Sequence, residues 1–343
     1  MSAKPDKGSG AEEVLRNYFL SLGYFVVRGC KFRYEGFDVT DVDLWIYGKK
    51  SAVSRERVNV DIKNKKTPQA LERVFWAKGL QDILGLDGCI VATTDSREAV
   101  KQFGMQHNIR VLDGAFMARL AKSEKSHQNR ISEEDFFILV KLASLGKLGG
   151  DWLGIYERGK SLLLDGLSFD SCNSWLDDCG YFMEQSALVD SDGLPALRLL
   201  YLTAAKLLVA LDFILSQHIS ADVNSRVKIL DDGFRYGSAG KGFSQRMSLM
   251  MSSLVRGVSN DFELGKSIER ELDSQIKSVR ADVIADYFSR GNVVNSLFEL
   301  SREFEAFGFA IMAQKPDLLS SGAQGVLGII ADFHQLDRKK VFG

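Results

Sequence analysis

The stretch VTDVDLWIYGKKSAVSRERVNVDIKNKK, residues 39–66, decides how the first third of this chain folds. Its two apolar runs, residues 39–48 and 57–63, alternate apolar and polar side chains with a period of two. A polar turn joins them, which is typical of two strands paired as a hairpin. Each strand is therefore expected to have an apolar face toward a core and a second face where acidic groups gather.

The alternation separates the chemical groups of the two strands. In the first strand Val42, Leu44 and Ile46 point one way, and Asp41, Asp43, Trp45 and Tyr47 the other. In the second strand Val58, Val60 and Ile62 point one way, and Asn59, Asp61 and Lys63 the other. If the strands pair as a hairpin, Asp43 and Asp61 can share a face with Lys63.

Asp43 and Asp61 would repel each other at such close range unless a cation lay between them. Carboxylate oxygens are hard ligands that suit Mg²⁺ or Mn²⁺, and Glu12 or Glu13 of the preceding segment could complete the set. A divalent ion there would polarise a phosphodiester and lower the pKa of a bound water. Lys63 could orient that water and stabilise charge on the phosphate. These residues predict metal-assisted phosphodiester hydrolysis.

The segments around the hairpin alternate helix and strand. Residues 10–23 have apolar side chains at helical spacing and end at Gly23, and residues 24–32 read as a strand. After the hairpin, we expect a helix over residues 67–85 and a buried strand at 89–94. A helix capped by Ser96 and a short strand at 109–112 follow. This order predicts an α/β domain with a central mixed sheet flanked by helices.

Strand patterns fade from about Ile131, and long amphipathic or apolar helices follow. We expect a two-part chain: an α/β domain over residues 1–125, and an all-α domain over residues 126–343. Predicted helices of the second part include residues 132–145, 194–218, 261–289, 292–312 and 322–334.

The motifs of the first part resemble the PD-(D/E)xK restriction-endonuclease-like superfamily. AEEVLRNYFLSLGY (11–24) resembles the opening helix of its Mrr-like and resolvase-like branches, which favours Glu12 over Glu13 as the helical acid. VTDVDL (39–44) resembles the second element, with Asp43, and VDIK (60–63) the third. VATTDSREAVKQFGMQHNIRVLDGAFMARL (91–120) is similar to the end of Mrr-like domains. The resemblance covers residues 8–121. Val42 stands where the family name has proline, and Asp61 where glutamate is commoner.

The resemblance implies a restriction-endonuclease-like fold and a Mg²⁺-dependent or Mn²⁺-dependent endonuclease, a phosphodiester hydrolase. Its site would contain Glu12, Asp43 and Asp61 as metal ligands and Lys63 as a further catalytic residue. The Mrr-like branch implies restriction of foreign DNA or anti-phage (antiviral) defence, and the resolvase-like branch implies recombination or repair. The alternative is a non-catalytic nucleic-acid-binding or sensor protein on the same scaffold. The helical domain would serve sensing, oligomerisation or partner docking, by fold analogy alone.

Basic residues next to the hairpin are candidate contacts to DNA. Lys65 and Lys66 follow Lys63, and this run fits a solvated strand end as well as a patch that binds phosphates. Lys78 and Gln81 lie one turn apart on the next predicted helix and could also reach phosphates, although an exposed helix face is the simpler interpretation. Residues 1–130 contain 22 Lys and Arg against 16 Asp and Glu, a balance of +6, which suits a polyanionic partner only weakly.

Composition excludes some other classes. The four cysteines form no CxxC pair and the four histidines no i, i+4 pair, so we expect no zinc site and reduced thiols in a cytoplasmic protein. Residues 234–246 (FRYGSAGKGFSQR) lack the spacing of a phosphate loop and are expected to be a flexible basic loop. The apolar run from Leu194 contains Arg198, Lys206 and Asp212, so a buried helix is expected rather than a membrane span.

Overall fold

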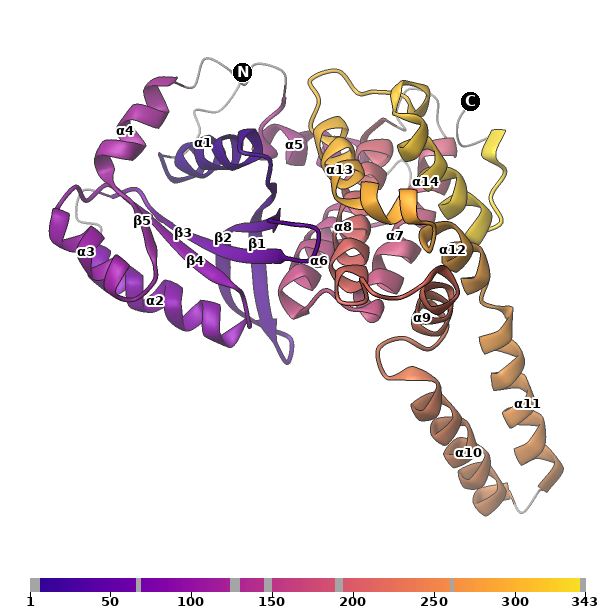
Figure 1. Ribbon diagram of the computed structural model, residues 1–343. Coiled ribbons are helices and arrows are strands. Elements are labelled where there is room, and N and C mark those ends of the chain that lie inside the picture. Colours follow the sequence, from indigo (N-terminus) through magenta and orange to yellow (C-terminus); the bar gives the residue numbers. More distant parts are fainter. Residues whose placement is uncertain are drawn as a thin grey trace.

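The computed structural model describes residues 7–65, 69–123, 130–144, 150–188, 194–259 and 262–339. Its first part (residues 1–125) contains a sheet flanked by helices, and its helical part (residues 126–343) packs beside them (Figure 1). The elements of the first part are α1 (Lys7–Ser21), β1 (Phe25–Tyr34), β2 (Phe37–Lys49), β3 (Arg55–Lys63), α2 (Ala70–Ile83), β4 (Gly88–Thr93), α3 (Glu98–Gln106), β5 (Arg110–Leu112) and α4 (Gly114–Ser123). The predicted order of helix and strand is confirmed.

The helical part contains helices of very different length. They are α5 (Glu133–Ser144), α6 (Trp152–Asp165), α7 (Phe169–Leu188), α8 (Leu194–Ser216), α9 (Val223–Tyr236), α10 (Gly240–Ser259), α11 (Phe262–Ser278), α12 (Ala281–Phe288), α13 (Gly291–Gly308), the 3₁₀ turn η2 (Pro316–Leu318) and α14 (Ser321–Phe333). Within its described residues, the only extended pairing of this part is a single bridge between Arg130 and Ala310. A mixed α/β first part followed by a mostly helical second part is therefore confirmed.

The sheet has the strand order β1-β2-β3-β4-β5. The first three strands form an antiparallel meander, and β4 and β5 add in parallel after helical crossovers. In the β2–β3 hairpin, Leu44 pairs with Val60 and Ile46 with Val58. This register places Leu44, Ile46, Val58 and Val60 on one face, as the alternation predicts. The prediction is wrong for Val42, which packs with its strand partner Cys30 in the core that contains Trp45 and Tyr47.

One face of the sheet is covered by α1 and α4. The even-numbered residues Leu44, Ile46, Val58 and Val60 pack there against Leu15 and Phe19 of α1, with Phe116 and Met117 of α4 at the edge. The helices lie on the same side of the sheet in Figure 1. This layer is the core that the alternating pattern predicts.

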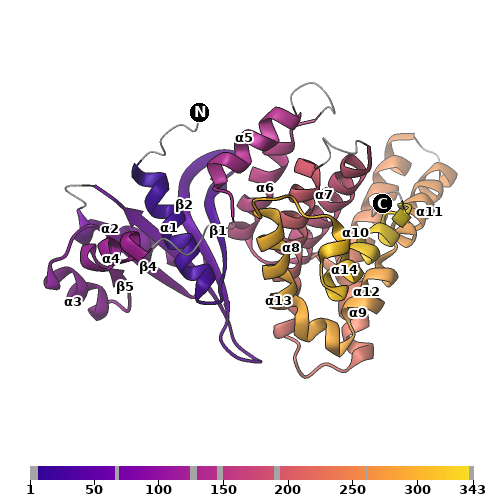
Figure 2. The same ribbon diagram turned by 90° about the horizontal axis from the view of Figure 1, so that it is seen from above.

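The opposite face is covered by two different groups of helices. Over β3, β4 and β5, α2 and α3 form a small core with Cys89, Val91 and Val74. Over β1 and β2, the helical part packs directly on the sheet (Figure 2), and Trp45 and Tyr47 are completely buried in its core. The sheet face that carries the acidic residues is therefore covered by helices along the middle of β2.

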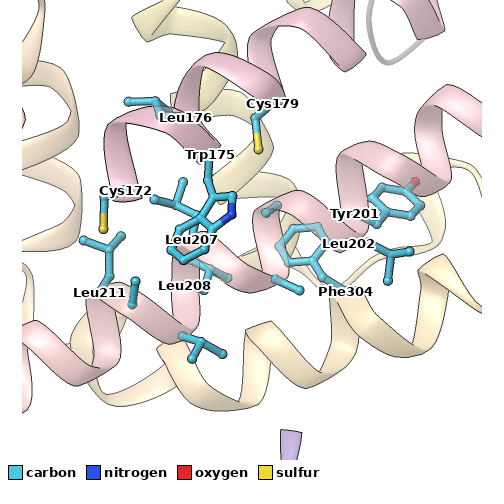
Figure 3. Packing of buried hydrophobic residues seen from close by; sticks show 14 of the residues in the cluster. Cys172, Trp175, Leu176, Cys179, Tyr201, Leu202, Leu207, Leu208, Leu211 and Phe304 are labelled. Carbon is cyan, nitrogen blue, oxygen red and sulfur yellow. The ribbon is translucent and has the colours of Figure 1, made fainter. Parts of the chain in front are cut away.

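The core of the helical part is built around α8. Trp175 of α7 lies among Leu207, Leu208 and Leu211 of α8, and Phe304 of α13 packs on the same helix (Figure 3). The indole N–H of Trp175 donates to the carbonyl oxygen of Gly159, 3.0 Å away. Among the described helices, α8 is the one long and apolar enough to cross a membrane, and 89% of its most apolar window is buried inside the protein.

The charged residues of α8 have specific places in this core. The Arg198 guanidinium donates to the carbonyl oxygens of Gly308, the last residue of α13, and of Ala310 and Ile311 just beyond it. The Asp212 carboxylate accepts from the Tyr47 hydroxyl at 2.6 Å and from Arg55 of β3. Asp212 therefore joins α8 to the sheet, and Arg198 joins it to the end of α13.

Three local predictions are wrong. Residues 261–289 form two helices, because the Arg235 guanidinium binds the carbonyl oxygens of Ile276, Lys277 and Val279 and ends α11 there. Residues 234–246 are the end of α9, a short turn and the start of α10, not a flexible loop. Ser96 does not cap α3: its N-cap is Arg97, whose backbone N–H binds the Asp95 carboxylate.

α10 and α11 form a hairpin that projects from the rest of the molecule (Figure 1). Toward α11, α10 presents small residues, and the Ser248 and Ser252 hydroxyls are buried there without a hydrogen-bond partner in the structure. Its outer side exposes a row of large apolar residues: Phe243, Met247, Met250, Leu254 and Val258. The usual distribution of polar and apolar side chains is reversed in this helix.

Candidate active site

The candidate residues on the hairpin meet where the β2–β3 ladder stops. Leu44 and Val60 are the last paired residues, and beyond them the Asp43 carboxylate accepts a hydrogen bond from the backbone N–H of Ile62 at 2.6 Å. The Asp43 carboxylate thus accepts the hydrogen bond that a backbone carbonyl group of β2 would accept if the ladder continued. The bond places the Asp43 carboxylate beside the segment Asp61-Ile62-Lys63.

Asp43 is an unusual carboxyl group. Burial raises its pKa from 3.8 to about 6, against the hydrogen bond from Ile62, which lowers it. Glu12 raises this pKa further, while Arg73 and Lys63 lower it. Asp43 therefore interacts electrostatically with Glu12, with Lys63 and with Arg73, which is the ion-pair partner of Asp61.

Asp61 is buried and lies on β3 opposite Val91 of the parallel strand β4. Its carboxylate forms a two-point ion pair with Arg73 in the first turn of α2, in which the Arg73 Nε to Asp61 Oδ2 distance is 2.7 Å. Arg73 reaches it because α2 runs back along the sheet after β3, so the helix begins near the end of the strand. Because Arg73 lies in the first turn of the helix that follows Asp61-Ile62-Lys63, the sequence alone could have indicated it as a partner of Asp61.

Glu12 of α1 is held by Arg28 of β1. The Glu12 Oε2 atom lies 2.9 Å from Nη2 and 3.2 Å from Nε of Arg28. Burial raises the pKa of Glu12, and the nearby Arg28 counteracts that rise. The same guanidinium binds Glu13 at 2.8 Å and Glu134 of α5 at 2.8 Å. Arg28 therefore links the helical acid to the helical part of the chain.

Each of the three predicted metal ligands has a protein partner. Glu12 binds Arg28, Asp61 binds Arg73, and Asp43 binds the Ile62 amide. Across the described ranges, no three His, Cys, Asp or Glu side chains are grouped closely enough to hold a metal ion. The chemistry of the donor set, the three carboxylates of Glu12, Asp43 and Asp61, suits a hard cation, which would compete with Arg28 and Arg73.

The basic residues predicted to contact DNA fall into two groups. Lys63 ends β3 half-buried, and Lys65 follows it with an exposed side chain, so both lie at the site. The Lys65 carbonyl oxygen accepts from the Thr94 hydroxyl, which fixes this loop to the end of β4. Lys66 lies outside the described residues.

Lys78 and Gln81 are not brought to the acidic cluster. The Lys78 ammonium binds Gln81 at 3.2 Å and Asp82 at 2.7 Å, and the Gln81 amide donates to the Leu86 carbonyl oxygen, before β4 begins. Because β3 and β4 are parallel, this is the end of the sheet opposite Lys63. Any phosphate contact by these two residues would be separate from the cluster.

Comparisons with protein-family models, curated proteins and solved structures return no match to this chain.

Proposed function

We propose that residues 8–121 form a metal-dependent endonuclease domain of the PD-(D/E)xK class that hydrolyses phosphodiester bonds of DNA. The observation that carries the proposal is the end of the β2–β3 ladder. There Asp43 binds the Ile62 amide, and Asp61 and Lys63 flank that amide in the chain. The mixed sheet with α1 on one face and α2 on the other supports the restriction-endonuclease-like fold that the motifs suggest.

The resident cation would be Mg²⁺ or Mn²⁺, held by Asp43, Asp61 and Glu12. When bound, it would supply Lewis-acid polarisation of the phosphate and a more acidic water. A cation would also relieve the buried negative charge of Asp43, whose pKa burial raises to about 6. At the other two acids, Asp61 and Glu12, positive charge is supplied by Arg73 and Arg28.

The chain's own cations have distinct tasks in this proposal. Lys63, on the strand that carries Asp61, stabilises negative charge on the scissile phosphate. Lys65 lies exposed just beyond it and extends the positive charge along a DNA backbone. The helical part positions Glu12 through the contact between Arg28 and Glu134. A conformational change in the helical part can therefore change the position of Glu12. Such coupling suits a cytoplasmic restriction or defence nuclease whose helical part senses a target, oligomerises or docks a partner.

The alternative function is a non-catalytic nucleic-acid-binding or sensor protein on the same scaffold. A specific observation favours it: Arg73 and Arg28 already neutralise Asp61 and Glu12. Ion pairs of this kind can hold acids in place for structural reasons alone. The two functions differ in whether DNA is cut.

A cleavage assay distinguishes them. Supercoiled plasmid, linear duplex, single-stranded DNA and RNA are incubated with the full chain and Mg²⁺, Mn²⁺ or EDTA. The variants are Asp61→Asn and Lys63→Met, and the matched controls are Asp38→Asn, an exposed Asp on β2, and Lys122→Met, an exposed Lys on α4. We expect metal-dependent cutting of DNA that falls at least about a hundredfold in the two variants and stays unchanged in the controls.

Two results would contradict the catalytic proposal. Cutting that survives EDTA, or that is equal in Asp61→Asn and wild type, removes these residues from the chemistry. Binding of DNA without cutting under any metal supports the non-catalytic alternative. Cutting of RNA alone would keep the mechanism and correct the substrate.

A further inference from the structure

A cavity of about 460 Å³ lies between the β2–β3 turn and the helical part, away from the candidate active site. It is lined by side chains from the hairpin, the end of α8, the following turn, α9 and the start of α13. The residues that determine its chemistry are Lys49, Arg55, Asp212, His218, Arg226 and Gly291. Arg55 begins β3 and Lys63 ends it, so the cavity and the acidic cluster are roughly 26 Å apart along the strand.

The lining has an excess of positive charge. Asp212 is its one acidic residue, and this carboxylate is engaged by Arg55 and by the Tyr47 hydroxyl. Lys49 and Arg226 form no ion pair with an acid in the part of the chain that the structure describes. Arg226 interacts electrostatically with Asp222, whose carboxylate caps α9 by accepting from the Ser225 N–H at 2.7 Å. The cavity is thus lined by two cations, Lys49 and Arg226, that form no salt bridge among the described residues.

Both cations are held at the wall by backbone carbonyl groups. The Lys49 ammonium donates to the Asn295 carbonyl oxygen over a long 3.4 Å, which leaves its other protons directed elsewhere. Arg226 donates from Nε to Ser289 at 2.9 Å and from Nη1 to Ala221 at 2.5 Å. Neutral carbonyl partners hold these side chains in position without removing their charge.

The start of α13 adds to the positive potential. Gly291, Val294 and Asn295, on one side of its first turns, line the cavity. Its N-cap residue, Arg290, makes no side-chain capping bond. A Cβ atom at Gly291 would meet no atom within 4 Å, so the backbone of the first turn is accessible there. Exposed N–H groups at the start of a helix favour an anion, here beside Lys49 and Arg226.

We propose that this cavity binds a small phosphorylated molecule of about nucleotide size, with its phosphate between Lys49, Arg226 and the first turn of α13. The volume falls within the usual range for small-molecule sites, and Leu215, Ile219 and Val294 provide apolar wall for an organic group. Walls from five segments fit a compact ligand better than a long nucleic-acid backbone. Because the lining joins the hairpin to the helices, the ligand would tie the two parts of the chain together.

The proposal is independent of nuclease activity and is tested by binding. Inorganic phosphate, pyrophosphate and AMP are titrated into the full chain by calorimetry at low ionic strength. The test variant is Lys49→Gln, and the matched control is Lys50→Gln, whose lysine pairs with Glu56 and does not line the cavity. We expect at least one probe to bind wild type and Lys50→Gln equally, and Lys49→Gln at least tenfold more weakly.

Arg226→Gln is the second variant, with circular dichroism to verify its fold, since Arg226 also bonds two carbonyl groups. A bound probe should also raise the melting temperature of wild type, because a ligand selective for the folded state stabilises it. Absence of binding by all three probes at millimolar concentration overturns the proposal, as does equal binding by Lys49→Gln. Lys49-dependent binding of a DNA oligonucleotide without binding of the small probes would make the cavity a nucleic-acid contact and also overturn it.

Discussion

Asp43 is negatively charged at neutral pH in surroundings that favour its neutral form, and Asp43→Asn removes that charge. Burial raises its pKa from 3.8 to about 6 in the folded protein. Between these two values the folded state holds a proton that the unfolded state has lost, so the free energy of unfolding falls as pH rises. Each pH unit in this window lowers it by about 1.4 kcal/mol, so the full effect is about 3 kcal/mol and is complete above pH 6.

The asparagine variant should therefore be more stable than wild type by up to about 3 kcal/mol at pH 7.5 and equal to it near pH 4. Its amide oxygen can still accept from the Ile62 N–H, which at present donates to the Asp43 carboxylate at 2.6 Å. The measurement is urea unfolding, followed by circular dichroism, at several pH values from 4 to 7.5 with EDTA present. Asp38→Asn, at an exposed position, is the control and should show no such dependence.

The same pair of proteins links stability to the proposed function. At pH 7.5, Mg²⁺ or Mn²⁺ should raise the melting temperature of wild type and leave that of Asp43→Asn unchanged, because the amide no longer attracts a hard cation. A variant that is less stable than wild type at pH 7.5, or a stability difference constant from pH 4 to 7.5, would refute the assigned electrostatics of Asp43.

Three further substitutions test the packing. Glu305→Gln removes the acid that binds Arg16 at 2.8 Å and Arg130 at 2.6 Å, and should lower the free energy of unfolding by about 3–5 kcal/mol. The measurement is urea unfolding with the exposed control Glu299→Gln, and equal stability of the two variants would contradict the prediction. Tyr47→Phe loses the buried 2.6 Å bond to Asp212 and should cost about 1–3 kcal/mol in the same assay, and no loss would mean that Arg55 alone satisfies this carboxylate. Ser252→Ala replaces a buried hydroxyl that has no partner, so we expect a gain of about 1 kcal/mol in thermal unfolding, and a loss would show that the hydroxyl is bonded.

The local pattern of apolar and polar residues was sufficient to predict the order of helices and strands in the first part. Period-two alternation placed Leu44 and Val60 on the α1 side of the sheet, as the register confirms. It also put Asp43 and Asp61 at the end of the same hairpin. Alternation reports which side chains share a face, but not what covers that face. The burial of Trp45 and Tyr47 beneath the helical part depends on residues more than 100 positions away.

The sequence by itself determined the mixed α/β start and the helical remainder, because neighbouring residues impose strand and helix periods directly. The grouping of Glu12, Asp43, Asp61 and Lys63 in one site stays a prediction. Only the tertiary structure showed that Arg73 pairs with Asp61, and that Arg28 joins Glu12 to Glu134 of α5. It alone assembled the basic cavity from the hairpin, three helices and the turn after α8. Such contacts form when distant segments bury their apolar faces together, and no local spacing encodes which charged side chains then meet.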